Sequence, residues 1–530
     1  MKFHFRKTER ISLAMVLAAT VLVVSRASSQ GLDSAALLKP PTDTWPTYNG
    51  DYSGRRFSTL DQINAQNVSS LTLAWAFHTP THTLKSTPLV VNGILYLTAP
   101  DNVWAVDARF GRQIWHYTRK SEGDHIGHRG LAMYKDWLYF TTPDAHLICL
   151  NAKDGTVRWN VELADGKLGY FSTMAPLVVK DHVIAGVSGD VTDVPGFLVS
   201  IDPDSGAIQW RWDTRPKPGE PGSETWPDAE ASLHGGGMTW MTGTYDPDLN
   251  LLYWGIGNPN PVLAGEGRPG DNLYTCSIVA LNPDIGKLVW YYQVSPHDVH
   301  DWDATQTPVL FDAAFKGKPH KLLAQASRNG FFFLLDRTNG EHLVTAPFID
   351  QTWASGVNSK GQPIPKKDSA PSPDGALVEP GSDGSTNWMA PSFDPQTNLF
   401  YVAARRLFSV YYNTVETKAE GWGGRDRILW ANSTLRALDY KTGKVVWNRE
   451  LGEGESLQGI LTTAGHLLFT ADNEGNLLAL DPATGKTLWH LNIGGELLAS
   501  PMTYQLDRRQ YLIIPIQDTL YAFALPEKQM

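Results

Sequence analysis

The sequence predicts an all-β fold, an eight-bladed β-propeller, and three observations support this prediction. A short motif that combines a turn with a tryptophan recurs along most of the chain. Tryptophan is abundant, with 19 residues among 530. The composition is turn-rich and globular, with 47 Gly, 34 Pro, 42% hydrophobic and only 19% charged residues. Since the chain is longer than a usual single-core domain, one repeat architecture explains its length well.

The repeat is a hydrophobic strand, then Asp or Asn, then Gly four residues later, then Trp four residues beyond. It occurs seven times, at Asp107/Gly111/Trp115, Asn151/Gly155/Trp159, Asp202/Gly206/Trp210, Asn282/Gly286/Trp290, Asp336/Gly340 with Val344 in the Trp place, Asp439/Gly443/Trp447 and Asp481/Gly485/Trp489. Trp75 ends an eighth strand, 40 residues before Trp115.

This spacing has a physical basis in the chemistry of a tight hairpin. Asp or Asn caps the turn with its side chain, and Gly takes the positive φ that closes it. The strand then runs outward to a large aromatic residue, which can wedge between neighbouring sheets of a radial array. Eight strand ends at intervals of 40 to 54 residues, lengthened to 80 and 103 by insertions, therefore indicate eight blades.

The propeller is expected to span residues 45–526, after a linker at 30–44. The strands at 510–516 and 520–524 should close the ring by completing a blade with N-terminal strands. Three segments interrupt the period, at 213–237, 345–392 and 413–432. Because loops on a rigid scaffold often carry function, these insertions are candidate parts of a site.

The N-terminus has the pattern of a secretory signal peptide over residues 1–29. Four basic residues precede position 11, an apolar run follows from Ile11 to Val24, and small residues lie at 27–29. An uncleaved anchor is the alternative, although the run is shorter than the roughly 20 residues of a membrane span. Removal of this segment takes away five basic residues and one acidic residue, which lowers the net charge from −10 to −14. That charge disfavours nucleic acid as a partner, and no transmembrane segment is expected after cleavage.

The two cysteines, Cys149 and Cys276, are too few for a disulfide framework or a cysteine-rich zinc site. The sequence contains no Cys-x-x-Cys-His, the attachment motif of c-type haem. We therefore expect no haem. Any redox cofactor should be held without a covalent bond.

Several further motifs resemble those of the quinoprotein alcohol dehydrogenases, propeller enzymes that hold pyrroloquinoline quinone (PQQ) and a calcium or lanthanide ion. The resemblance runs from Trp45 to about Leu525. It is carried by residues 56–64 (RFSTLDQIN), 234–237 (HGGG), 255–261 (GIGNPNP), 268–274 (RPGDNLY), 296–298 (PHD), 327–331 (SRNGF) and 386–388 (TNW). The motifs are specific as a set, although each alone is weak.

The resemblance implies a role for each matching residue. Asp301 is similar to the catalytic base, which takes the hydroxyl proton while hydride moves to the quinone. The metal ligands implied are Asn258, Asp301 and Asp303, hard oxygen donors that suit Ca²⁺ or a lanthanide. The cofactor contacts implied are Arg129, Thr173, Trp240, Arg328, Asn387 and Trp388.

The same comparison with the family shows departures in one pocket. Val191 stands where relatives have a glutamate metal ligand, and Lys85 replaces a glutamate that touches the cofactor. Gly123 and Asp124 replace an adjacent cysteine pair, Leu457 a large aromatic residue, and Arg405 an asparagine. These departures resemble those of quinoprotein homologues that lack cofactor residues.

Two readings of function follow. The first is an exported, periplasmic oxidoreductase that oxidises an alcohol or similar hydroxyl compound and passes electrons to a separate acceptor such as a cytochrome c. The second is a cofactor-free propeller that acts as a scaffold or binding module in the cell envelope. A transition-metal site at His297, Asp298, His300, Asp301 and Asp303 is a third, weaker reading, because the first two residues equally form a turn-stabilising pair.

Overall fold

The computed structural model describes residues 1, 31–32, 35–80, 83–122, 127–189, 192–233, 235–413, 421–455 and 457–526. The signal peptide expected at 1–29 lies almost entirely outside these residues, as do Gly123, Asp124 and Val191. Over the described ranges the strands form eight sheets of four or five strands and one separate hairpin. The predicted eight-bladed propeller is therefore confirmed.

The first five complete blades follow one another along the chain, and each is built from four consecutive antiparallel strands. Their strands are β3 Leu89–Val91, β4 Ile94–Ala99, β5 Asn102–Asp107 and β6 Arg112–Thr118; β7 Ala132–Tyr134, β8 Trp137–Thr141, β9 His146–Asn151 and β10 Val157–Glu162; β11 Leu177–Val179, β12 His182–Gly186, β13 Phe197–Ile201 and β14 Ile208–Asp213; β15 Thr244–Asp246, β16 Leu251–Gly255, β17 Ser277–Asn282 and β18 Lys287–Gln293; and β19 Val309–Phe315, β20 Lys318–Ala326, β21 Phe331–Asp336 and β22 Glu341–Pro347.

The remaining three blades carry additional strands or close the ring. The sixth blade contains β25 Ala376–Val378, β26 Ser392–Asp394, β27 Leu399–Asn413, β28 Gly424–Asp439 and β29 Val445–Glu453. The seventh contains β30 Leu461–Thr463, β31 Leu467–Ala471, β32 Asn476–Leu480 and β33 Thr487–Asn492, extended by the parallel strand β1 Phe57–Ser58. The eighth combines β2 Thr72–His78 with β34 Met502–Leu506, β35 Arg509–Ile516 and β36 Thr519–Ala524.

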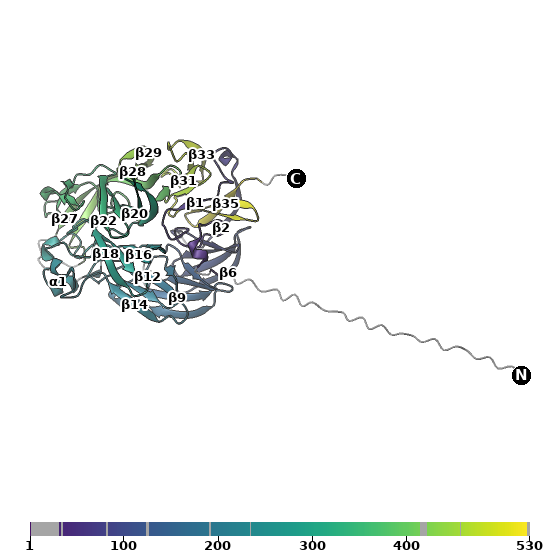
Figure 1. The fold of residues 1–530 in the computed structure, drawn as a ribbon, viewed down its shortest axis with the longest axis horizontal. Coiled ribbons are helices and arrows are strands. Elements are labelled where there is room, and N and C mark those ends of the chain that lie inside the picture. Colours follow the sequence, from purple (N-terminus) through teal and green to yellow (C-terminus); the bar gives the residue numbers. More distant parts are fainter. Residues whose placement is uncertain are drawn as a thin grey trace.

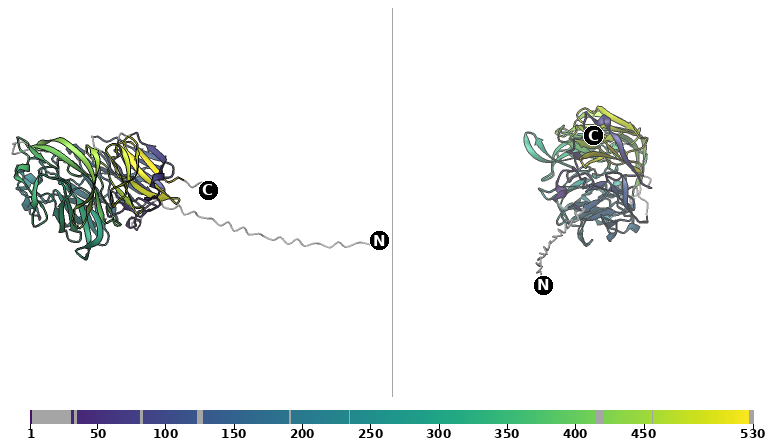
Figure 2. Two further views of the ribbon diagram at one scale, coloured as in Figure 1. Left: turned by 90° about the horizontal axis from the view of Figure 1, so that it is seen from above. Right: turned by 90° about the vertical axis from the view of Figure 1, so that its right-hand side faces the viewer.

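The eighth blade joins the two ends of the chain, as predicted from the C-terminal strands. Strand β2 pairs antiparallel with β36, and Trp75 lies opposite Ala522. Figure 1 shows the sheets following one another around a ring in sequence order, with β35 beside β1 and β2. The two further views of Figure 2 agree, since the yellow C-terminal strands adjoin the purple N-terminal ones.

The remaining described elements are short and lie mainly in the insertions. They are the hairpin β23 Ala354–Val357 and β24 Pro363–Pro365, the helix α1 Ala229–Leu233, and the 3-10 turns Ala36–Leu38, Val68–Ser70, Gly166–Leu168, Ser223–Thr225, Gly265–Gly267 and Lys367–Ser369. Among the described residues, no helix is long and apolar enough to cross a membrane.

Six of the repeat tryptophans tie one blade to the next, as the sequence spacing predicts. The indole N–H of Trp75 donates a 3.2 Å hydrogen bond to the carbonyl of Ala108, which follows the turn residue Asp107 of the next blade. Five more repeat tryptophans make the same bond, Trp115 to Ala152, Trp159 to Pro203, Trp210 to Pro283, Trp290 to Arg337 and Trp447 to Pro482.

The repeat glycines are required by this docking. Gly111 has a φ of +68°, and a Cβ added there would lie 2.6 Å from the ring of Trp75. The ring therefore covers the turn where only a glycine leaves room for it. The junction that lacks a tryptophan differs, because Gly443 faces Ala346 instead.

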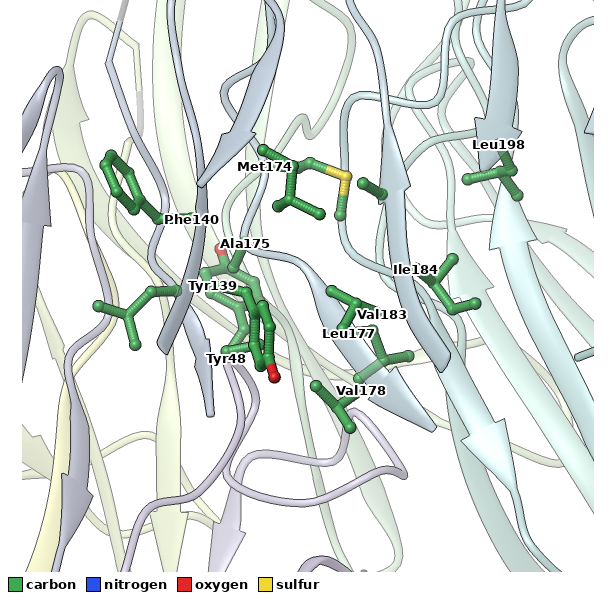
Figure 3. Packing of buried hydrophobic residues seen from close by; sticks show 14 of the residues in the cluster. Tyr48, Tyr139, Phe140, Met174, Ala175, Leu177, Val178, Val183, Ile184 and Leu198 are labelled. Atoms are coloured by element: carbon green, nitrogen blue, oxygen red, sulfur yellow. The ribbon is translucent and has the colours of Figure 1, made fainter. Parts of the chain in front are cut away.

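The apolar core lies between the blades, in five clusters of buried residues within the described ranges. Figure 3 shows Tyr139 and Phe140 of β8 on one side and Leu177, Val183 and Ile184 of the next sheet on the other. All five side chains are at most 3% exposed. This packing between neighbouring sheets makes the ring a rigid support for the loops at its axis.

Candidate functional site

The candidate site residues lie mostly on the segments that lead into the first strand of successive blades. Arg129 precedes β7, Thr173 precedes β11, Trp240 precedes β15, and Trp388 precedes β26. These entering segments are joined by backbone hydrogen bonds, including Thr87 N–H to the Arg129 carbonyl at 3.0 Å and Arg129 N–H to the Thr173 carbonyl at 2.9 Å. Residues far apart in the sequence are thereby held around one axis.

The carboxylate of Asp303 is surrounded by three donors. Its side chain accepts hydrogen bonds from the backbone N–H of Asn258 at 2.7 Å and from the indole N–H of Trp240 at 2.7 Å. The guanidinium Nη1 of Arg328 lies 3.1 Å from the same carboxylate. Because Asp303 is fully buried, these three donors replace the water that would otherwise solvate its carboxylate.

Arg328 also contacts Asp301, the residue expected to act as base. Its Nη2 donates to Oδ2 of Asp301 at 3.0 Å and to the carbonyl of Ser382 at 2.9 Å. The Asp301 side chain is 13% exposed, and its backbone has a φ of +68°. One guanidinium therefore orients both carboxylates, and Asp301 is the more accessible of the two.

Two indoles and two cations form a cluster that is joined to this acidic pair through Trp240. The Arg129 guanidinium carbon is 4.8 Å from the ring centroid of Trp240 and 5.5 Å from that of Trp388. The Lys85 ammonium is 5.8 Å from the Trp388 centroid. Arg129 also donates to the hydroxyl of Thr173. The structure thus brings together Arg129, Thr173, Trp240 and Trp388 with the unexpected Lys85.

Two buried amide oxygens of the candidate site, the Oδ1 atoms of Asn258 and Asn387, are among those that lack hydrogen-bond partners within the described part of the chain. An orphaned buried acceptor is costly unless a ligand or cation satisfies it. Asn258 lies at the acid cluster through its backbone bond to Asp303, and the Nδ2 of Asn387 donates to the Asp383 carbonyl at 3.2 Å. Both oxygens are suitable donors for a hard cation or a bound hydroxyl.

The substituted positions make contacts that the sequence did not reveal. Arg405 is 1% exposed, and it bonds Oε2 of Glu455 at 2.7 Å and the Gly384 carbonyl at 2.9 Å. Leu457 packs against the large apolar cluster. Glu455 was missed because it lies 50 residues from Arg405 and belongs to no motif.

The transition-metal reading of the histidine cluster is not supported. His297 Nδ1 bonds the Gly270 carbonyl at 2.8 Å, and His300 Nε2 bonds the Ser369 carbonyl at 2.7 Å. The Asp298 carboxylate accepts the backbone N–H of Trp302 at 3.1 Å. No group of three or more His, Cys, Asp and Glu side chains over the described ranges is arranged to hold a metal ion. These residues therefore stabilise the turn that carries Asp301.

Comparison with known proteins shows that this chain is similar to quinoprotein dehydrogenases. A family model described as "Glucose/ethanol/alcohol dehydrogenase, beta-propeller domain" matches residues 45–373, and one described as "Outer membrane protein assembly factor BamB" matches residues 431–512.

Individual relatives agree over nearly the whole chain. The quinoprotein alcohol dehydrogenase PedH of Pseudomonas putida is 34% identical, over 96% of this chain and 92% of the relative. The lanthanide-dependent methanol dehydrogenase of Methylacidiphilum fumariolicum is 32% identical, over 94% and 89%. The solved quinohemoprotein alcohol dehydrogenase ADHIIG from Pseudomonas putida superposes with a TM-score of 0.89 at 31% identity, over 95% of this chain and 83% of that one.

Proposed function

This chain belongs to the PQQ-dependent quinoprotein alcohol dehydrogenases, and from that premise we propose that it is an exported enzyme that oxidises an alcohol or a related hydroxyl compound. One observation carries the proposal: the indoles of Trp240 and Trp388 lie beside the cations of Lys85 and Arg129, and Trp240 is bonded to the carboxylate of Asp303. Trp240 and Trp388 offer ring faces to a planar group, and Arg129 lies within 5.5 Å of both rings. A flat, polyanionic cofactor fits these residues.

The metal that accompanies PQQ in this family fits the residues less completely. The orphaned Oδ1 of Asn258 and the carboxylate of Asp301 offer oxygens, whereas both oxygens of Asp303 already accept hydrogen bonds. Ca²⁺ takes about 6 to 8 oxygen ligands, so cofactor and water must supply the rest. We propose that Asn258, Asp301 and Asp303 hold Ca²⁺ or a lanthanide, with Asp303 exchanging one of its present donors for the ion.

The bound cofactor and its cation would supply a polarised quinone that accepts hydride. The chain itself supplies the base and its support. Asp301 takes the substrate hydroxyl proton on its carboxylate, and Arg328 holds that carboxylate in place through the 3.0 Å bond to Oδ2. Thr173 and Asn387 are proposed to contact the cofactor, since they lie on the segments that lead into β11 and β26, like the other candidate site residues.

Electron transfer and location are also part of the proposal. Some relatives are quinohemoproteins, so family membership alone does not exclude haem. The printed sequence has no Cys-x-x-Cys-His, and we propose that electrons pass to a separate carrier such as a cytochrome c. The basic and apolar N-terminal segment supports export to the periplasm.

The first experiment is a titration of the mature protein with PQQ in the presence of Ca²⁺ and then La³⁺, followed by quenching of tryptophan fluorescence. Saturable, metal-dependent quenching that weakens in Trp240→Ala supports the enzyme. An alcohol screen with an artificial electron acceptor then tests turnover.

The alternative is a cofactor-free propeller that acts as an envelope scaffold. It is favoured by the replacement of pocket residues with Lys85, Arg405 and Leu457, and by the match of residues 431–512 to an outer-membrane assembly factor model. Absence of PQQ binding with either ion, together with a specific crosslinked envelope partner, would favour this second function.

A further inference from the structure

The cationic side chains of the candidate site differ in whether a carboxylate lies beside them within the described part of the chain. Arg328 is paired with Asp301 and Asp303, and Arg405 is paired with Glu455. These two arginines therefore need no further anion.

Lys85 and Arg129 have no such carboxylate partner among the residues that the structure describes. Neither forms a salt bridge with a carboxylate within the described part of the chain. Arg129 is 3% exposed, its Nη1 donates only to the neutral hydroxyl of Thr173, and its buried Nε has no partner among the described residues. Burying a cation without a counter-charge is unfavourable.

Lys85 is half-buried and held against the same site. A Cβ added at Gly127 would lie 2.7 Å from Cδ of Lys85, which shows how closely the aliphatic stem packs there. The ammonium lies over Trp388 and not in open solvent. Burial, and then the neighbouring Arg129 guanidinium, lower the pKa of Lys85 from its ordinary value. Two cations are thus kept close together at an energetic cost.

The cost has an explanation if both cations bind one anion. Arg129 lies beside both indole rings and Lys85 lies beside that of Trp388, so a planar anionic ligand fits here. We propose that Lys85 and Arg129 form one subsite for a carboxylate of the planar quinone cofactor. This inference rests on the proposed function. It means that the Lys85 ammonium attracts a cofactor carboxylate, at a position where the resemblance implies a glutamate.

The test is the affinity of PQQ for the mature protein, measured by tryptophan quenching in the presence of Ca²⁺ at low and high salt. Lys85→Gln should weaken binding about tenfold to a hundredfold, the usual value of a charge-assisted hydrogen bond. It should also reduce the salt dependence of the affinity. Lys85→Arg, which keeps the charge, should retain most of the affinity.

Lys153→Gln is the matched control, because it removes the same charge from an exposed turn on the second blade. It should leave the affinity unchanged. Urea unfolding of each variant establishes that the fold is intact. If Lys85→Gln binds PQQ within twofold of the wild type, the subsite is wrong even though the proposed function stands.

A second ligand separates the subsite from the function. Benzene-1,3,5-tricarboxylate is planar and anionic but carries no quinone. If the wild type binds this acid and not PQQ, and Lys85→Gln loses that binding, Lys85 and Arg129 form an anion site, but its assignment to the quinone cofactor is wrong and the proposed function fails. If the wild type binds neither ligand, both are overturned.

Discussion

The indole N–H of Trp240 donates a 2.7 Å hydrogen bond to the carboxylate of Asp303. The same tryptophan presents its ring to Arg129 at 4.8 Å. One side chain therefore supports the acid cluster with its edge and offers a stacking surface with its face. This coupling explains why a buried tryptophan is suited to the axis of the propeller.

The first prediction concerns the hydrogen bond from the indole N–H of Trp240, as distinct from the packing of its ring. Trp240→Phe keeps an aromatic ring but removes the donor to a buried carboxylate, a bond worth about 1.5–3 kcal/mol. Trp302→Phe is the control, because the Trp302 indole donates at 3.1 Å to the neutral carbonyl of Gly381. Urea unfolding should show a loss about 1 kcal/mol greater for Trp240→Phe. Equal losses in the two variants would mean that the bond to Asp303 contributes no more than an ordinary neutral one.

The second prediction concerns Asp301. Asp301→Asn keeps the shape of the side chain but removes its ability to accept a proton, so turnover should fall by a factor of about 10² to 10⁴. PQQ affinity and urea unfolding report whether the pocket and the fold survive. Asp248→Asn, at a side chain that is 74% exposed, is the control and should retain wild-type turnover. Unchanged turnover in Asp301→Asn would exclude this residue as the base.

The fold could be predicted in detail because its signals are local. Each copy of the repeat places the turn, the glycine and the tryptophan within nine residues, as in Asp107, Gly111 and Trp115. The bond from Trp75 to Ala108 and the contact with Gly111 follow directly from that spacing. Closure by β2 and β36 was predictable too, since the C-terminal strands lacked another partner.

The site was less predictable because its contacts join distant segments. The resemblance implied roles for Asp301, Asp303 and Trp240. In the structure Arg328 contacts both carboxylates, and Trp240 donates a hydrogen bond to Asp303. The pairing of Arg405 with Glu455 has no sequence signal. The charge balance at Lys85 likewise depends on which carboxylates lie nearby, and spacing does not reveal this.

The third prediction tests the docking of blades. Gly111→Ala should destabilise the protein by more than Gly219→Ala, although both glycines have a positive φ, +68° and +88°. At Gly219 nothing lies within 4 Å of an added Cβ, so only the backbone cost of about 1–2 kcal/mol applies. At Gly111 the methyl group meets the ring of Trp75 at 2.6 Å, and the total should be at least about 3 kcal/mol. Similar urea midpoints for the two variants would contradict the docking model.

The last prediction is a dependence of stability on pH that originates at His300. Burial lowers the pKa of His300 from 6.5 to about 4, because the ring is enclosed against Trp302 at a centroid distance of 4.1 Å. The folded state therefore holds a neutral ring, while the unfolded chain takes up a proton below pH 6.5. This stability is present above pH 6.5 and is lost as the pH falls toward 4, by about 2–3 kcal/mol at pH 4.5. His300→Asn should remove that part of the acid sensitivity when unfolding free energies at pH 7 and pH 4.5 are compared. His490→Asn, at an exposed histidine, should keep the wild-type difference, and an unchanged difference in His300→Asn would place the acid sensitivity elsewhere.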